Sequence, residues 1–185
     1  MSAIEAGQNT MVFYVKPDGT LNVLSSPPPP PKDPNKPTTG GAGAVTSRPE
    51  YKPDTITLKN TNSTFILNAP STRTPIPYNQ ISAIWFTHGE QHSTVKEFRI
   101  YYVYTDTLNG VSTLREICKT GDGEWTQGTL DGRKIETTAD SLISANHHGQ
   151  HIRVHFQQGV KKQLWMVITP IVNPDWRPYM VAQNF

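Results

Sequence analysis

Short apolar runs of four to seven residues, separated by turn sequences, recur along most of the chain. They are rich in Val, Ile, Tyr, Phe and Thr, which fit the pleated surface of a strand. Asn-Gly, Asp-Gly and Pro-Asp-Gly sequences between them are typical of β-hairpins. The pattern therefore predicts an all-β protein with strands over residues 11–15, 20–24, 55–58, 64–67, 81–86, 98–104, 113–118, 142–146, 152–156 and 163–168.

The runs also recur as a larger unit, in which a strand containing Ser-Ala is followed by a polar turn, an aromatic-rich strand, a hairpin and a further strand. Three copies begin near Ser2, Ser82 and Ser144. Units of about 50 to 60 residues with four strands each are typical of β-propeller blades. We expect about three four-stranded antiparallel blades in a single domain over residues 1–185, at about 1–68, 80–130 and 141–185.

Residues 25–53 interrupt this pattern with a tract rich in Pro, Gly, Ser and Thr. Its five consecutive prolines favour a stiff polyproline II segment, because proline fixes φ and lacks an amide proton. The tract offers too little apolar surface to offset the entropy lost on ordering it. We expect a disordered proline-rich insertion within the first blade, with a docking segment for a partner protein as the alternative.

Charge and composition narrow the possible partners and compartments. The formal net charge is +2 and the basic residues are scattered, which is not the pattern of a nucleic-acid-binding protein. A single cysteine, Cys118, excludes an internal disulfide framework. No apolar stretch approaches the roughly 20 residues of a membrane span, and the first residues lack the features of a secretory signal. We expect no nucleic-acid or membrane partner, and a soluble protein that is cytoplasmic or is secreted without a signal peptide.

The second repeat carries a more specific pattern. FRIYY at 98–102 is followed by LRE at 114–116 and GEWTQG at 123–128. This combination resembles the blades of fungal fucose-specific lectins, which are six-bladed β-propellers, and of their shorter two-blade bacterial relatives. The resemblance implies a degenerate three-blade member of that family, equivalent to half of a six-bladed propeller.

In that family, Arg and Glu of one blade hydrogen-bond the sugar, and aromatic residues of the next blade stack on its apolar face. The resemblance therefore implies one carbohydrate-binding site, formed by Arg99 and Glu116 of the second blade with Trp176 of the third. A guanidinium and a carboxylate supply fixed donors and acceptors for adjacent hydroxyls. An indole ring can cover the C–H face of the sugar.

Two further residues are weaker candidates for sugar binding, because their repeats lack the rest of the motif. Trp125 belongs to a site whose Arg and Glu positions, in the first repeat, fall on Met11 and Val23. Arg153 of the third repeat stands with Met166 where the Glu is expected. At most one of the three sites is therefore complete.

Structural interpretations of the same residues remain open. Arg99 and Glu116 lie on adjacent predicted strands, where opposite charges commonly form a surface pair worth about 0.2 to 1 kcal/mol. Trp125 and Trp176 could instead pack between blades as core residues.

Neither the histidines nor the cysteine indicates catalytic or metal chemistry. His147, His148 and His151 are clustered, but the turn lacks the acidic or cysteine ligands that would complete a metal site. Cys118 has no evident His and Asn or Asp constellation around it. We assign no catalytic residue, metal ligand or cofactor.

The favoured interpretation is a fucose-type carbohydrate-binding, lectin-like protein. One alternative is a non-hydrolytic, cyclase-like enzyme that reuses the propeller pocket for a small metabolite, because apolar residues replace the sugar ligands in two repeats. Another is a partner-binding module. Three blades cannot close a ring and would leave apolar faces exposed. Either two copies pair to make six blades, as the homodimer that we expect, or the chain is a shortened version of a longer protein.

Overall fold

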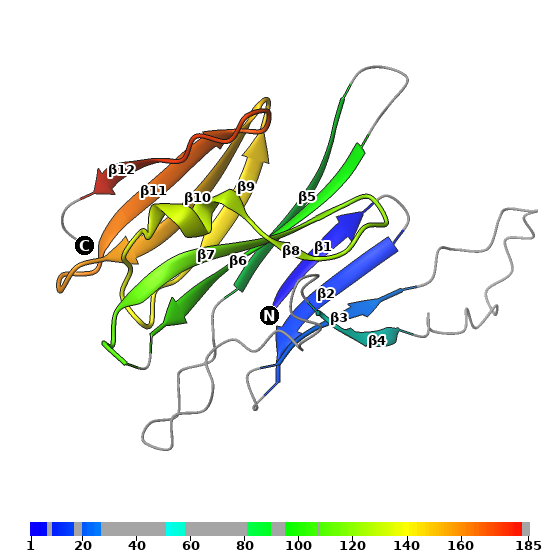
Figure 1. Cartoon of the computed structure of the whole chain (residues 1–185), viewed down its shortest axis with the longest axis horizontal. Coiled ribbons are helices and arrows are strands. Elements are labelled where there is room, and N and C mark those ends of the chain that lie inside the picture. Colours follow the sequence, from blue (N-terminus) through cyan, green and yellow to red (C-terminus); the bar gives the residue numbers. More distant parts are fainter. Residues whose placement is uncertain are drawn as a thin grey trace, which may run out of the picture.

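The computed structural model contains three four-stranded antiparallel sheets. They follow one another in chain order and lie side by side, as Figure 1 shows. This arrangement confirms the all-β fold of three four-stranded blades. The described residues are 1–6, 9–16, 20–26, 51–57, 81–89, 95–106 and 108–182.

Each sheet, called blade 1, 2 or 3 below, is built from four strands that are consecutive in the sequence. A short 3-10 helix, η1 (Thr129–Arg133), follows blade 2. Within the described ranges, no helix has the length and apolar character needed to cross a membrane. Blade 1 contains β1 (Ser2–Ala6), β2 (Asn9–Val15), β3 (Leu21–Ser25) and β4 (Lys52–Thr55), blade 2 contains β5 (Ile81–His88), β6 (Val95–Thr105), β7 (Ser112–Thr120) and β8 (Thr126–Gln127), and blade 3 contains β9 (Ser144–His148), β10 (His151–Gln158), β11 (Gln163–Pro170) and β12 (Arg177–Ala182).

The fourth strand of each blade departs most from the predicted pattern. The strand expected at 55–58 is instead β4, which ends at Thr55, and the one expected at 64–67 lies outside the described residues. β8 and β12 were not predicted. Each pairs with one neighbouring strand only, and most of their residues are exposed, so they need no apolar periodicity.

Both described ends of the proline-rich tract belong to blade 1. Ser25 is the last residue of β3 and pairs with Lys52 of β4. The Ser26 hydroxyl accepts a hydrogen bond from the Thr10 backbone N–H at 2.8 Å. The segment outside the sheet is therefore shorter than residues 25–53, and residues 27–50 lie outside the described part of the chain.

The pairing registers align the blades residue by residue. In blade 2, Ser82 of the first strand pairs with Tyr101 of the second strand, and Tyr101 pairs with Glu116 of the third. The serines of the Ser-Ala pairs in blades 1 and 3 have the same relation to their second and third strands. Counting from these pairs gives the equivalent positions in all three blades. They are Met11, Arg99 and Arg153; Phe13, Tyr101 and His155; Val23, Glu116 and Met166; and Tyr51, Trp125 and Trp176.

Apolar side chains fill a first seam between blades 1 and 2 and a second seam between blades 2 and 3. The same hydrogen bond crosses both seams. Ser2 Oγ accepts from the Ala83 backbone N–H at 2.9 Å, and Ser82 Oγ accepts from the Ala145 backbone N–H at 2.9 Å. The inner strands β1, β5 and β9 are therefore joined by one repeated contact.

Candidate functional site

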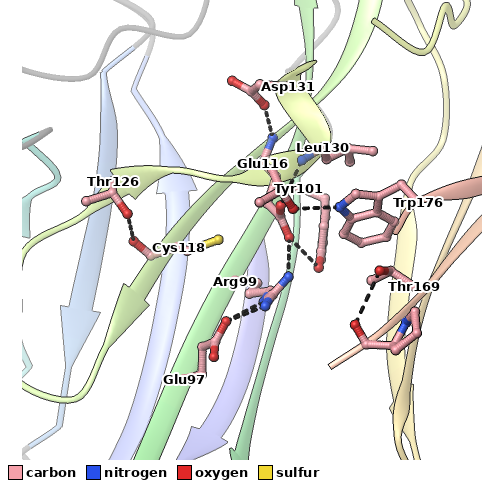
Figure 2. Close-up of polar contacts among 12 residues, drawn as sticks. Glu97, Arg99, Tyr101, Glu116, Cys118, Thr126, Leu130, Asp131, Thr169 and Trp176 are labelled. Atoms are coloured by element: carbon pink, nitrogen blue, oxygen red, sulfur yellow. Dashed lines mark hydrogen bonds and ion pairs between the residues drawn. The ribbon is translucent and has the colours of Figure 1, made fainter. Parts of the chain in front are cut away.

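Arg99 and Glu116 form a buried ion pair on neighbouring strands of blade 2 (Figure 2). Arg99 Nη1 donates to Glu116 Oε1 at 2.9 Å. Arg99 is 5% exposed and Glu116 is fully buried. Both side chains lie on the face of the blade that carries Tyr101, whose ring packs in the second seam. The pair is therefore not the solvent-exposed cross-strand pair considered from the sequence.

Glu97 is a third member of this charged network, and the sequence analysis missed it. Its Oε1 accepts from Arg99 Nε at 2.6 Å and lies 2.5 Å from Arg99 Nη2. Its Oε2 lies 2.8 Å from His88 Nε2. The alternation of the strand could have revealed Glu97, because residues two apart in a strand share a face and Glu97 precedes Arg99 by two.

The Glu116 carboxylate is fully buried, and residues of blade 2 and η1 hydrogen-bond both of its oxygens. Oε1 also accepts from the Tyr101 hydroxyl at 3.0 Å, and Oε2 accepts from the Leu130 backbone N–H at 3.3 Å. A Cβ atom added at Gly128 would lie 2.1 Å from Glu116 Oε2. A glycine is therefore needed at 128, where the GEWTQG motif ends.

The network is least buried at His88 and Glu97. The side chains of His88 and Glu97 are 29% and 10% exposed, whereas that of Glu116 is fully buried. Arg99 Cζ lies 5.6 Å from the centroid of the Phe86 ring, and Phe86 stacks on His147 of blade 3 with 5.1 Å between centroids. Side chains from both blades therefore form the rim of the second seam.

Trp176 lies beside the network but is buried, at 3% exposure. Its ring meets Tyr101 edge-on with 6.0 Å between centroids, and its indole N–H donates to Thr129 Oγ1 at 3.0 Å. Figure 2 shows the indole pointing from blade 3 toward Tyr101 of blade 2. The structure thus brings together Arg99, Glu116 and Trp176, with Trp176 as a residue of the seam.

The two weaker candidates lie elsewhere. Trp125 is 8% exposed and meets Phe13 edge-on in the first seam, with 6.1 Å between centroids. This is the contact that Trp176 makes with Tyr101, repeated one blade earlier. Arg153 is half-buried on the other side of blade 3 from the second seam. Neither residue belongs to the Arg99 network.

Electrostatics favour a charged Arg99 and a protonated Tyr101. Burial lowers the pKa of Arg99, but the charge of Glu116 and further negative groups raises it above its ordinary value, so the guanidinium stays charged. Burial, reinforced by the charge of Glu116, raises the pKa of Tyr101 well above its usual range, so its hydroxyl remains a donor. Burial also raises the pKa of Cys118, which disfavours a thiolate nucleophile there.

The histidine cluster of blade 3 forms no ligand set in the part of the chain that the structure describes, where no group of three or more His, Cys, Asp or Glu side chains could hold a metal ion. His147 Nε2 lies 2.9 Å from the Gly149 carbonyl oxygen and its ring stacks on Phe86. These contacts give His147 a packing role at the seam.

No family model matches the chain, and neither does any curated protein. Among solved structures, the chain is similar to a variant of AofleA, a fucose-specific lectin from Arthrobotrys oligospora. The TM-score is 0.60 over 96% of this chain and 40% of AofleA, at 16% sequence identity. The chain has the fold of this lectin. It spans about two fifths of the length of AofleA, and a likeness at this identity concerns the fold alone.

The AofleA variant carries alanine in place of three arginines that follow one another at intervals of 53 residues. Arg99 and Arg153, which the strand registers make equivalent, are 54 residues apart in this chain. The interval between Arg99 and Arg153 is therefore close to the interval between the substituted arginines of AofleA.

Proposed function

We propose that this protein binds carbohydrate at the second seam, with a fucose-type sugar as the ligand class. One observation carries the proposal. The positions that hold Arg99 and Glu116 in blade 2 hold Met11 and Val23 in blade 1, and the first seam packs with those apolar residues. A charged network is therefore not needed to join two blades of this fold.

The cost of the network strengthens this argument. Taking a guanidinium and two carboxylates out of water costs several kcal/mol per ion, and a buried ion pair often contributes no more than apolar residues of similar volume. Glu97, Arg99 and Glu116 are each less than a tenth exposed. A binding function that uses the hydrogen-bonding groups of these three residues explains why charged residues occupy these buried positions.

The chemistry of the network suits a sugar. Arg99 has five N–H donors, and it contacts carboxylates through Nε, Nη1 and Nη2. We expect the remaining N–H groups to donate to a sugar hydroxyl. Glu97 and His88 add a carboxylate and an imidazole ring at the rim. A hydroxyl entering there would share these groups with existing partners, so we expect weak binding, with Kd in the micromolar to millimolar range, or about −4 to −8 kcal/mol.

The AofleA comparison supports the proposal through the fold and through the arginine interval. The 53-residue interval between the substituted arginines of AofleA is close to the 54 residues between Arg99 and Arg153. Arg99 has Glu116 beside it and Trp176 on the facing blade, whereas Arg153 has Met166 at the glutamate position. We therefore expect Arg99 to bind the sugar and Arg153 to contribute little.

Titration calorimetry with methyl α-L-fucoside tests the proposal. The wild-type protein should release heat at millimolar sugar, the Arg99→Ala variant should not, and the Arg153→Ala variant should match the wild type. Absence of heat with wild-type protein at millimolar sugar would reject a fucose-type site. Equal losses in both variants would reject the assignment to Arg99.

A further inference from the structure

Each outer face of the three-blade stack carries equivalents of residues that form contacts within the two seams. On the outer faces, these equivalents have no facing blade in the described part of the chain. In each seam, a serine hydroxyl of one blade accepts a backbone N–H of the next, and an aromatic ring of the next blade packs edge-on against the second strand of the first. The strand registers identify the residues that would make these contacts at the open ends.

The outer face of blade 3 carries the serine and the second-strand residue that blades 1 and 2 use to contact the next blade. Ser144 is the equivalent of Ser2 and Ser82, and it is exposed. His155 is the equivalent of Phe13 and Tyr101. Those two residues are fully buried, whereas His155 is half-buried.

The outer face of blade 1 carries the complementary residues. Tyr51 is the equivalent of Trp125 and Trp176, which are 8% and 3% exposed, but Tyr51 is 39% exposed. The Ala3 position, whose equivalents in blades 2 and 3 donate the seam hydrogen bond, is exposed too. Three apolar positions show the same contrast. Val12, Tyr14 and Leu24 are half-buried in blade 1, whereas their equivalents Ile100, Tyr102 and Ile117 in blade 2, and Val154, Phe156 and Val167 in blade 3, are at most 3% exposed.

We propose that blade 3 of one copy of this chain packs against blade 1 of a second copy, through a third seam built like the first two. Tyr51 would pack edge-on against the partner subunit's His155, and Ser144 Oγ would accept the backbone N–H of the partner subunit's Ala3. Each copy carries both sets of residues, so a twofold axis makes two identical seams and closes a ring of six blades. The half-buried apolar residues of blade 1 would then be buried, as their equivalents are.

The third seam would also place a seam aromatic on the face of blade 3 that carries Arg153. Arg153 is equivalent to Arg99, and its seam aromatic would be the partner subunit's Tyr51. Met166 stands at the glutamate position, so this site would keep only the arginine and the aromatic ring. The contacts of the third seam form without a sugar. Sedimentation can therefore test the dimer even if the protein binds no sugar.

Sedimentation equilibrium at micromolar concentration tests the third seam. The wild-type chain should have a mass of about 41 kDa, twice the 20.6 kDa of one copy. The Tyr14→Lys variant, which places a charge in the third seam, should shift the protein to the monomer. The Leu108→Lys variant is the matched control, because Leu108 lies in an exposed hairpin turn at 95% exposure and its substitution should leave the dimer intact. A stable wild-type monomer would overturn the proposal and leave these faces to another protein or to further blades.

Cross-linking distinguishes the closed dimer from other assemblies. A variant with both Ala3→Cys and Ser144→Cys should form a covalent dimer under mild oxidation, and each single variant should not. A ladder of higher species would indicate open head-to-tail association, and an uncross-linked dimer would indicate a different interface. Either result would overturn the twofold third seam.

Discussion

The blade 1 equivalents provide a direct way to ask whether the charged network stabilises the second seam. Blade 1 carries Asn9, Met11, Phe13 and Val23 at the positions of Glu97, Arg99, Tyr101 and Glu116. Two variants follow from this equivalence. The first is Arg99→Met alone, and the second combines it with Glu97→Asn, Tyr101→Phe and Glu116→Val.

The single variant should be strongly destabilised. Arg99→Met removes the cation between two buried carboxylates. Glu116 is fully buried, and its further donors among the described residues are the Tyr101 hydroxyl and the Leu130 backbone N–H. Loss of one partner from a buried ion pair costs about 3 to 5 kcal/mol. For a domain of this size, that is a fall in melting temperature of roughly 10 °C.

The four-residue variant should recover most of that loss, because it removes the unpaired charges and gives the second seam the residues with which the first seam packs. Denaturant unfolding should place it within about 2 kcal/mol of the wild type, since apolar replacement of a whole buried ionic group is often neutral. If it proves as unstable as Arg99→Met, the network stabilises the seam, and its cost no longer supports a binding role.

Two further predictions concern the surroundings of the site and the proline-rich tract. Burial raises the pKa of Asp131 to about 6, although its Oδ1 accepts the Glu116 backbone N–H at 2.7 Å. Because the folded protein binds this proton more tightly than the unfolded chain, the stabilising contribution of Asp131 is present below about pH 4 and is lost as the pH rises through 6. The free energy of unfolding of Asp131→Asn relative to the wild type should therefore increase between pH 4 and pH 7, and a difference that does not change with pH would contradict this. Deletion of residues 27–50, with Ser26 joined to Tyr51 by a short Gly-Ser linker, should preserve the fold, and a fall in melting temperature of more than about 5 °C would mean that the segment is packed.

The sequence predicts the blades well, because hydrophobic alternation reports on buried sheet faces. It also aligns Met11 with Arg99 and Val23 with Glu116, as the strand registers confirm. The fourth strands are hard to predict, because β8 contains only Thr126 and Gln127, both exposed.

The site is only partly predictable, because burial depends on how blades pack against each other. Nothing in the sequence indicates that Glu116 is fully enclosed, and the sequence leaves open whether Trp176 stacks on a sugar or packs between blades. Glu97 is visible from its spacing to Arg99, but its contact with His88 depends on the pairing of β5 with β6. Tyr51 could not be recognised as the equivalent of Trp125 and Trp176, since a long insertion precedes it and only the register of β4 identifies the position.

The tryptophan side chains offer the most direct test of a sugar site at the second seam. The chain has four Trp residues, and each indole N–H gives its own signal in a two-dimensional NMR spectrum. Trp176 borders the Arg99 network, whereas Trp125 lies in the apolar first seam. On titration with methyl α-L-fucoside, we predict a saturable shift of the Trp176 signal and an unchanged Trp125 signal. A shift at Trp125 with none at Trp176, or no shift of any indole signal at millimolar sugar, would contradict the proposed site.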